Sequence, residues 1–173
     1  MTPPGARMLA EMGEQPRVLA ALAARREELV AEVRAALGDA PPAGIVLVAR
    51  GSSDNAAVLG RYVLELATRR PVALAAPSLI TRYGARDRLD GWLAVGISQS
   101  GRTPEIVSVL ESYGASGART VAITNDRDSA LAHAAAATID TAAGAEQAVP
   151  ATKTVTSQFA AFALLAEALA GEV

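Results

Sequence analysis

From residue 44 onward the chain alternates between short apolar runs and longer amphipathic stretches. Each apolar run has the length and composition of a buried parallel strand, and each amphipathic stretch has the spacing of a helix that packs on a sheet. The runs that predict strands are 44–49, 71–75, 93–97, 119–124 and 138–141. The stretches that predict helices are 56–68, 78–84, 104–113 and 150–170. Strands that alternate with helices favour a parallel sheet covered on both faces, with right-handed crossovers.

Before the first strand, residues 7–37 have apolar positions near helical spacing and predict one or two helices. These positions are Leu9, Met12, Val18, Leu22, Leu29, Val33 and Leu37. Pro16 suits the first turn of the longer helix, and the GDAPP sequence at 38–42 ends it. An amphipathic arm outside the repeating unit must bury its apolar stripe against its own sheet or against a partner subunit. We expect a partner subunit.

The whole pattern predicts a helical arm over residues 1–40, followed by one α/β domain over residues 41–173. The expected architecture is a three-layer αβα sandwich with a five-stranded, parallel, doubly wound (flavodoxin-like) sheet. The chain of 173 residues is 51% hydrophobic and can build a real core, and no long linker or repeat divides it. Such a sheet has a switch point between its first and third strands, where ligands bind at the carboxyl ends of the strands.

Two loops rich in glycine and hydroxyl side chains follow the two strands that flank this switch point. The residues that we expect around one crevice there are Ser52, Ser53, Ser98, Ser100 and Thr103, and the same two loops also contain Gly51, Gln99 and Gly101. Free backbone N–H groups at a helix N-terminus, together with hydroxyl donors, suit an anion, and phosphate is the natural guest. The alternative is that these hydroxyls only cap helices. One cap needs one residue, whereas three hydroxyls and an amide follow the third strand.

A third polar segment covers residues 144–154. Glu146 is able to accept hydrogen bonds from sugar hydroxyls, and its residue type is equally compatible with a solvated loop acid. Lys153 is the single lysine among the 16 basic residues. It lies at the first turn of a helix, where the helix dipole disfavours a cation. This indicates a specific role for Lys153, either as a point charge near the ligand or in fixing the loop.

Several other charged or titratable side chains favour structural roles. We expect His133 at the surface or partly buried rather than in catalysis, and an arginine cluster over 82–88 on a solvated, ion-paired face. Arg102 is compatible with facing either the phosphate or solvent.

Composition narrows the function classes further. The net charge of −2 and the pI of about 5.5 give no electrostatic footprint for nucleic acid. Without cysteine there are no disulfides or thiolate nucleophiles, and we expect no metal and no cofactor. The first loop lacks GxGxxG spacing and no Walker A pattern occurs, which favours a smaller phosphate ester over a nucleotide. We also expect no signal peptide, no membrane span and a cytoplasmic location.

Three stretches together resemble the sugar isomerase (SIS) domain family. They are Gly51-Ser52-Ser53, the Ser98–Thr103 loop and the segment from Ala143 to Lys153, and Glu14-Gln15-Pro16 is similar to the family's preceding arm. The resemblance covers nearly the whole chain. It is to the first of the two SIS domains in glucosamine-6-phosphate synthases, amino-sugar-phosphate deaminases and related ketose–aldose isomerases.

This resemblance implies that a hexose or hexosamine 6-phosphate is the ligand. The residues that it implies for the phosphate are Ser98, Gln99, Ser100 and Thr103, with Ser53 beside them. Val149 and Ala151 stand where the family contacts the sugar. Ala151 departs from the Ser that is common there, so sugar selectivity is expected to differ.

The family's reaction is a proton transfer between C1 and C2 of an opened sugar, which needs a carboxylate base and a ring-opening histidine. The resemblance implies that a second SIS domain and a neighbouring subunit supply these groups. We therefore assign no catalytic residue, expect no turnover by this chain alone, and expect a homodimer or pairing with a second SIS domain. The alternatives are a non-catalytic sugar-phosphate sensor and a general phosphoryl-binding domain.

Overall fold

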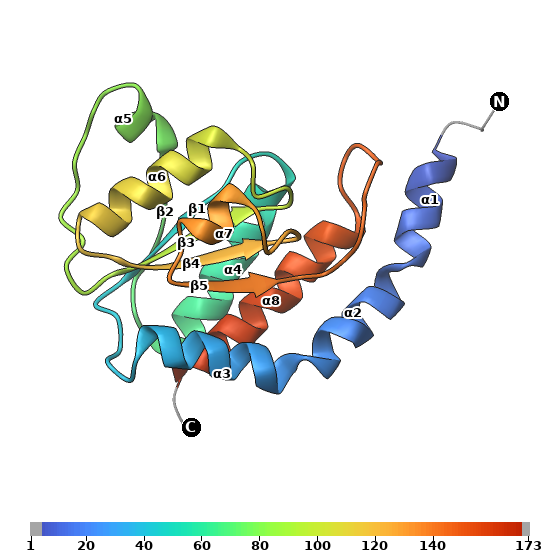
Figure 1. Cartoon of the computed structure of the whole chain (residues 1–173), viewed down its shortest axis with the longest axis horizontal. Helices are drawn as coiled ribbons and strands as arrows, with labels where there is room; N and C mark the ends of the chain where they lie inside the picture. The colour runs from blue at the N-terminus through green and yellow to red at the C-terminus, as the bar shows by residue number, and fades with distance from the viewer. Residues whose placement is uncertain (1–4, 171–173) are drawn as a thin grey trace.

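The computed structural model describes residues 5–170, in which a parallel sheet is covered by helices on both faces (Figure 1). Residues 1–4 of the predicted arm and residues 171–173 of the predicted α/β domain lie outside the described residues. The strands are β1 (Ile45–Val48), β2 (Val72–Leu74), β3 (Leu93–Ser98), β4 (Arg119–Thr124) and β5 (Ala137–Asp140). The helices are α1 (Ala6–Gly13), α2 (Gln15–Ala24), α3 (Arg26–Leu37), α4 (Ser52–Thr68), α5 (Pro77–Thr81), α6 (Pro104–Ala115), α7 (Ala130–His133) and α8 (Lys153–Ala170).

Within residues 5–170, the five strands lie in the order β2-β1-β3-β4-β5 and every pair is parallel. This confirms the predicted doubly wound α/β fold, with its switch point between β1 and β3. Several boundaries differ from prediction, and α4 begins at Ser52 rather than at residue 56. Strand β5 begins and ends one residue earlier, and α8 begins at Lys153 rather than at Pro150. Thr152 directly precedes the helix, and its N–H donates to the Glu146 side chain.

Two apolar layers hold the sheet between its helices. On one face, β1, β3 and β4 contribute Leu47, Val95 and Ile123 to a core shared with α3, α4 and α8. On the other face, residues such as Ala94 and Ala122 pack under α6 and α7. The chain therefore passes to opposite sides of the sheet after β1 and after β3, which places the starts of α4 and α6 at one edge.

Helices α4 and α8 pack closely because α4 carries a glycine at their contact. A Cβ atom built on Gly60 would lie 2.4 Å from the ring of Phe162, which is fully buried. Real Cβ atoms essentially never come so close, so only glycine fits without movement of the ring. This contact sets the spacing of two helices that both reach the switch-point edge.

The expectation that the arm buries its stripe against a partner subunit is wrong for α2 and α3. Val18, Leu22, Leu29 and Val33 are buried within this chain, because α2 and α3 pack along α8 and α3 also contacts β5. Within the described part of the arm, only α1 leaves large apolar side chains exposed, with Leu9 70% exposed and Met12 46%. The arm is thus part of the domain's own packing from α2 onward.

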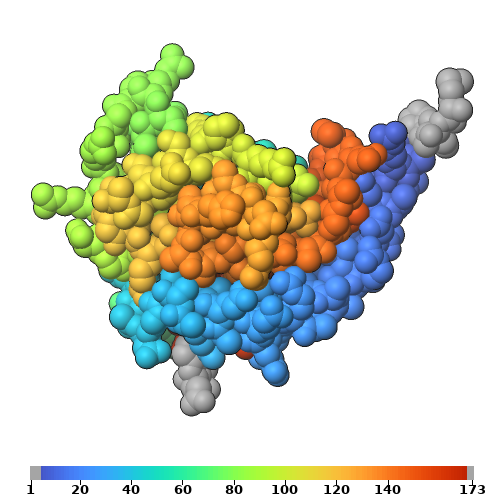
Figure 2. Space-filling model, in the orientation of Figure 1, coloured from blue at the N-terminus to red at the C-terminus, as the bar shows by residue number. Residues whose placement is uncertain are grey.

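Figure 1 shows α1 standing beside the loop that precedes α8. In the space-filling view this loop lies directly against the blue arm (Figure 2). Residues 5–170 contain no helix that is both long enough and apolar enough to cross a membrane.

Candidate functional site

A crevice of about 290 Å³ lies at the carboxyl ends of β1 and β3. Three segments line it: the start of α4, the loop from β3 to α6, and the loop that leads into α8. Its lining residues are Arg50, Ser52, Ser53, Ser98, Gln99, Ser100, Thr103, Ala148, Val149, Pro150, Ala151, Thr154 and Val155. The structure thus brings both hydroxyl-rich loops and the predicted sugar-contact segment to one place.

Three of the predicted site residues do not line this crevice: Gly51, Glu146 and Lys153. Gly51 supports the crevice as the residue before α4, with a positive φ of 61° that favours glycine. Glu146 and Lys153 take part in contacts behind the lining.

The loop after β3 is held in shape by the loop after β4. Gly101 has a φ of 61°, and a Cβ atom built on it would lie 2.0 Å from the Oγ of Ser129. Its N–H donates to the carbonyl of Ser98 (3.2 Å), and its own carbonyl accepts from the N–H of Leu131 (2.9 Å). The carbonyl of Gln99 likewise accepts from the N–H of Asn125 (3.0 Å). The loop is therefore fixed from behind, and its hydroxyls can face the crevice.

The hydroxyls of this loop are already organised by one another. The Oγ of Ser98 lies 3.2 Å from the Oγ1 of Thr103, so the two ends of the loop share a hydrogen bond. The Oγ of Ser100 accepts from the N–H of Arg102 (3.3 Å), which leaves the Ser100 proton free to be donated. Pro104 opens α6 directly after Thr103, so the positive end of this helix's dipole lies at this point.

Ser53 is oriented by a buried glutamine of α8. The Nε2 of Gln158 donates to the Oγ of Ser53 (3.0 Å), and both residues are buried. Because Ser53 already accepts this bond, its own hydroxyl proton is available to a ligand. The Oε1 of Gln158 is buried without a hydrogen-bond partner within the described chain.

A salt bridge joins the two hydroxyl-rich loops across the switch point. The guanidinium of Arg50 donates to both carboxylate oxygens of Glu105, at 3.0 and 3.2 Å. The hydrogen bond from Arg50 lowers the pKa of Glu105, and the same bond raises the pKa of Arg50. Arg50 is the one ionisable side chain among the residues that line the crevice in the described chain.

The carboxylate of Glu146 is hydrogen-bonded to residues that follow it closely in the sequence. Its Oε1 accepts from the N–H and the hydroxyl of Thr152, both at 2.7 Å, and its Oε2 accepts from the hydroxyl of Thr154. Burial raises the pKa of Glu146, but the hydrogen bonds from Thr154 and Thr152 together outweigh it, so the pKa lies below the ordinary value. Neither sequence-based interpretation, as a sugar ligand or a solvated acid, describes this arrangement.

The remaining charged candidates lie outside the crevice. Lys153 is 3% exposed, and its Nζ donates to Glu14 of the arm (2.9 Å), which agrees with a role in fixing the loop. Arg102 turns away to pair with Asp126 (3.0 Å). His133 is exposed at the end of α7.

Several residues of this site escaped sequence reasoning. The crevice is also lined by Arg50, Ala148, Pro150, Thr154 and Val155. Gln158 donates to the lining residue Ser53, and Glu11 accepts from the N–H of Gln147, which precedes the lining residue Ala148. The position of Arg50 at the carboxyl end of the first predicted strand, 44–49, indicates a place near the crevice. Gln158 and Glu11 have no such indication, because their partners are more than 100 residues away in the sequence.

Comparison with known proteins agrees with this arrangement. The family model described as SIS domain matches residues 41–168. A glutamine--fructose-6-phosphate aminotransferase [isomerizing] of Gloeobacter violaceus is 36% identical over 167 residues, which are 94% of this chain and 27% of that protein. The chain thus spans about a quarter of the length of this curated relative.

Two solved structures share the fold over nearly the whole chain. A candidate phosphosugar isomerase from Silicibacter pomeroyi is 40% identical with a TM-score of 0.89, over 96% of this chain and 51% of that one. The C-terminal domain of glucosamine-fructose-6-phosphate aminotransferase from Francisella tularensis is 27% identical with a TM-score of 0.76, over 95% and 47% of the two chains.

The hydrogen bonds of Glu146 predict a pH dependence of stability. A carboxyl whose pKa is lowered by folding stabilises the protein fully above its unfolded pKa of about 4.3, and this contribution is lost as the pH falls through the lower folded pKa. We expect Glu146→Gln to lower the free energy of unfolding by roughly 1–3 kcal/mol at neutral pH, because one acceptor is lost.

Urea denaturation at about pH 7 and at about pH 3 measures this effect. The difference between wild type and Glu146→Gln is expected to shrink at the lower pH. The matched control is Glu111→Gln, which changes an exposed carboxylate of α6 and is expected to leave the stability at both pH values close to wild type. A constant difference between wild type and Glu146→Gln would contradict the prediction.

Proposed function

The chain belongs to the SIS domain family, and from this we propose that its crevice binds a hexose or hexosamine 6-phosphate. The observation that carries the proposal is the meeting of two hydroxyl-rich loops, each followed by a helix N-terminus, at the switch point. Free N–H groups and the positive ends of helix dipoles favour an anion at such a place.

The phosphate is assigned to the loop between β3 and α6. The residues proposed to hold it are Ser98, Gln99, Ser100 and Thr103, with Ser52 and Ser53 on the facing side. The hydroxyls of Ser53 and Ser100 and one hydroxyl of the Ser98–Thr103 pair have protons to donate, and the dianion of a phosphate monoester offers only acceptors. The carboxylate of Glu105, in the first turn of α6, is paired with Arg50, which lessens its repulsion of a second negative charge near that helix start.

The sugar is assigned to the wall formed by residues 148–151. Val149 and Ala151 line the crevice at this wall, together with Ala148 and Pro150. These side chains supply apolar contact but no hydroxyl. We therefore propose that sugar selectivity comes from shape and from backbone groups at this wall rather than from a side-chain hydroxyl at position 151.

The reaction class proposed for the whole protein is sugar-phosphate isomerisation, amino transfer or deamination. The curated relative from Gloeobacter violaceus is an isomerising aminotransferase, but this chain matches only 27% of its length. No carboxylate and no imidazole lines the crevice within residues 5–170. This supports a binding role for the chain by itself, and it keeps a sugar-phosphate sensor as the second candidate function.

Pairing with another domain of the same kind is also a proposal. One face of α4 is apolar and exposed, with Val58 45%, Leu59 42%, Tyr62 66% and Leu66 81% exposed. Leu74 on the edge strand β2 is 39% exposed beside this helix. The solved relative from Silicibacter pomeroyi has about twice the length of this chain. We propose that a second copy covers the α4 face in the isolated protein.

Calorimetry with fructose 6-phosphate or glucosamine 6-phosphate tests the binding proposal. We expect wild type to bind and Ser98→Ala to bind roughly 10- to 100-fold more weakly, because a hydrogen bond to a charged group is worth about 1.5–3 kcal/mol. The control Arg88→Ala, which truncates an exposed arginine away from the crevice, is expected to bind as wild type does. Equal losses in both variants would refute the site assignment.

We expect the 173-residue chain to bind fructose 6-phosphate without converting it. Among residues 5–170, no carboxylate and no imidazole lines the crevice, so the described chain offers no such group there to carry the proton between C1 and C2. A coupled dehydrogenase assay for glucose 6-phosphate measures the conversion. Turnover above background that disappears in Glu146→Gln would show that this chain supplies its own base.

Light scattering tests the proposed pairing. We expect the wild-type chain at twice the monomer mass and Leu66→Arg at the monomer mass, because a charge in an apolar interface is left without a partner. The matched control Leu9→Arg changes another exposed leucine, on α1, and is expected to keep the wild-type mass. A monomeric wild type would rule the proposal out.

A further inference from the structure

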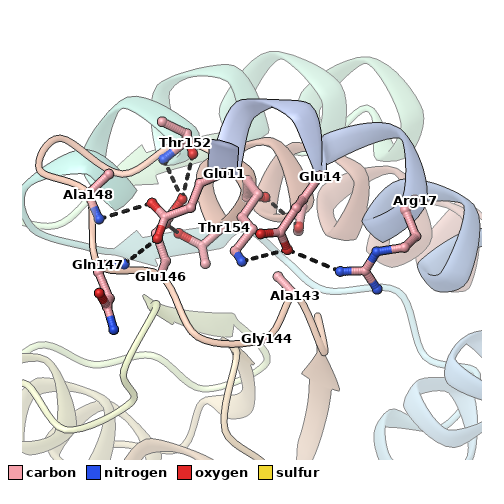
Figure 3. Close-up of polar contacts among 12 residues, drawn as sticks. Glu11, Glu14, Arg17, Ala143, Gly144, Glu146, Gln147, Ala148, Thr152 and Thr154 are labelled. Atoms are coloured by element: carbon pink, nitrogen blue, oxygen red, sulfur yellow. Dashed lines mark hydrogen bonds and ion pairs between the residues drawn. The ribbon is translucent and has the colours of Figure 1, made fainter. Parts of the chain in front are cut away.

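One wall of the crevice is held by the N-terminal arm. We name residues 147–151 the wall segment, since four of its five residues line the crevice. The carboxylate of Glu11, on α1, accepts from two successive backbone N–H groups of this segment. The distances are 2.6 Å from Gln147 N to Oε1 and 2.9 Å from Ala148 N to Oε2 (Figure 3).

The burial of Glu11 shows that this contact is specific. Glu11 is only 8% exposed, and each oxygen of its carboxylate accepts a hydrogen bond. A carboxylate so placed is costly unless its acceptors are satisfied. The two backbone N–H groups of the wall segment satisfy the carboxylate oxygens of Glu11, and the carboxylate in turn satisfies these two N–H groups.

Two further contacts fix the arm to the base of α8. The Nζ of Lys153, which is 3% exposed, donates to Oε2 of Glu14 (2.9 Å). The Nε2 of Gln15 donates to the Oγ1 of Thr156 (2.9 Å). The hydrogen bond from Lys153 lowers the pKa of Glu14. These contacts tie the junction of α1 and α2 to the point where the wall segment ends.

The wall segment has little else to hold it. Val149 is 92% exposed, so this side chain adds almost no packing. Glu146 fixes the end of the segment through Thr152, and Glu11 fixes its beginning. If Glu11 released the two amides, residues 147–149 would lose their attachment while the rest of the crevice stayed in place.

We propose that Glu11 is a positioning residue for the sugar-phosphate site, and that docking of the arm and binding of the ligand are thermodynamically coupled. This inference rests on the proposed function, because it concerns the same crevice. Coupling is reciprocal, so a bound ligand stabilises the docked arm by the same factor as the docked arm improves binding. Glu11 is not among the residues that line the crevice, and it acts through the backbone N–H groups of Gln147 and Ala148.

The test compares full-length wild type with Glu11→Gln by hydrogen exchange and by calorimetry with fructose 6-phosphate. The variant keeps the side-chain shape but presents an amide NH₂ to one of the two backbone donors. We expect exchange of the Gln147 and Ala148 amides to rise by about tenfold or more and binding to weaken by about 3- to 10-fold, from the loss of one charge-assisted bond.

Two further variants make the result specific. Glu27→Gln makes the same chemical change at an exposed position of α3 and is expected to alter neither measurement. Glu14→Gln weakens the docking through Lys153 and is expected to change both measurements in the same direction as Glu11→Gln, so the proposal remains testable if Glu11→Gln does not fold. Unchanged exchange in β3 shows that a variant is folded.

Each outcome bears on one proposal. If wild type binds and folded Glu11→Gln binds equally well, the positioning role fails while the proposed function stands. If exchange rises without any loss of affinity, the contact is only structural and the coupling is refuted. If wild type binds no sugar phosphate, the proposed function fails and the positioning role falls with it.

Discussion

The site depends on the opposite directions that the chain takes after β1 and after β3. After β1 it crosses to α4 on one face of the sheet, and after β3 it crosses to α6 on the other face. Two helices therefore begin at the same edge without competing for space, and the gap between their first turns is the crevice. The salt bridge from Arg50 to Glu105 spans this gap and fixes its width from the outside.

The close contact of α4 and α8 carries this geometry into the interior. Gly60 of α4 lets the two helices approach until the ring of Phe162 lies against it. Nearer to the N-terminal ends of the same two helices, this approach brings Gln158 of α8 to Ser53 of α4. A packing contact in the core thereby decides the direction of a hydroxyl in the crevice. The apolar core and the polar site are parts of one arrangement, because both are set by the distance between these helices.

The sequence was sufficient for the sheet order and for the two hydroxyl-rich loops, since both follow from local patterns. Apolar runs predict strands, and the doubly wound order then places the loops after β1 and β3 together. The contacts of Glu11, Glu14 and Gln158 span more than 100 residues, and no spacing rule reports them. The arm was assigned to a partner for the same reason: its amphipathic stripe shows that something covers it but not what. Lys153 has a residue type that is unusual for this chain, and its partner in the structure is Glu14 of the arm rather than a residue of the crevice.

The hydrogen bond from Gln158 to Ser53 affects which hydrogen bonds the crevice offers to a guest. Ser53 accepts a bond from the amide and keeps its proton to donate to a guest, and Ser100, which accepts from the N–H of Arg102, does the same. A floor of donors matches a guest that carries no protons of its own. For the phosphate ester proposed as the ligand, such donors are best matched by the dianion, because its terminal oxygens only accept hydrogen bonds.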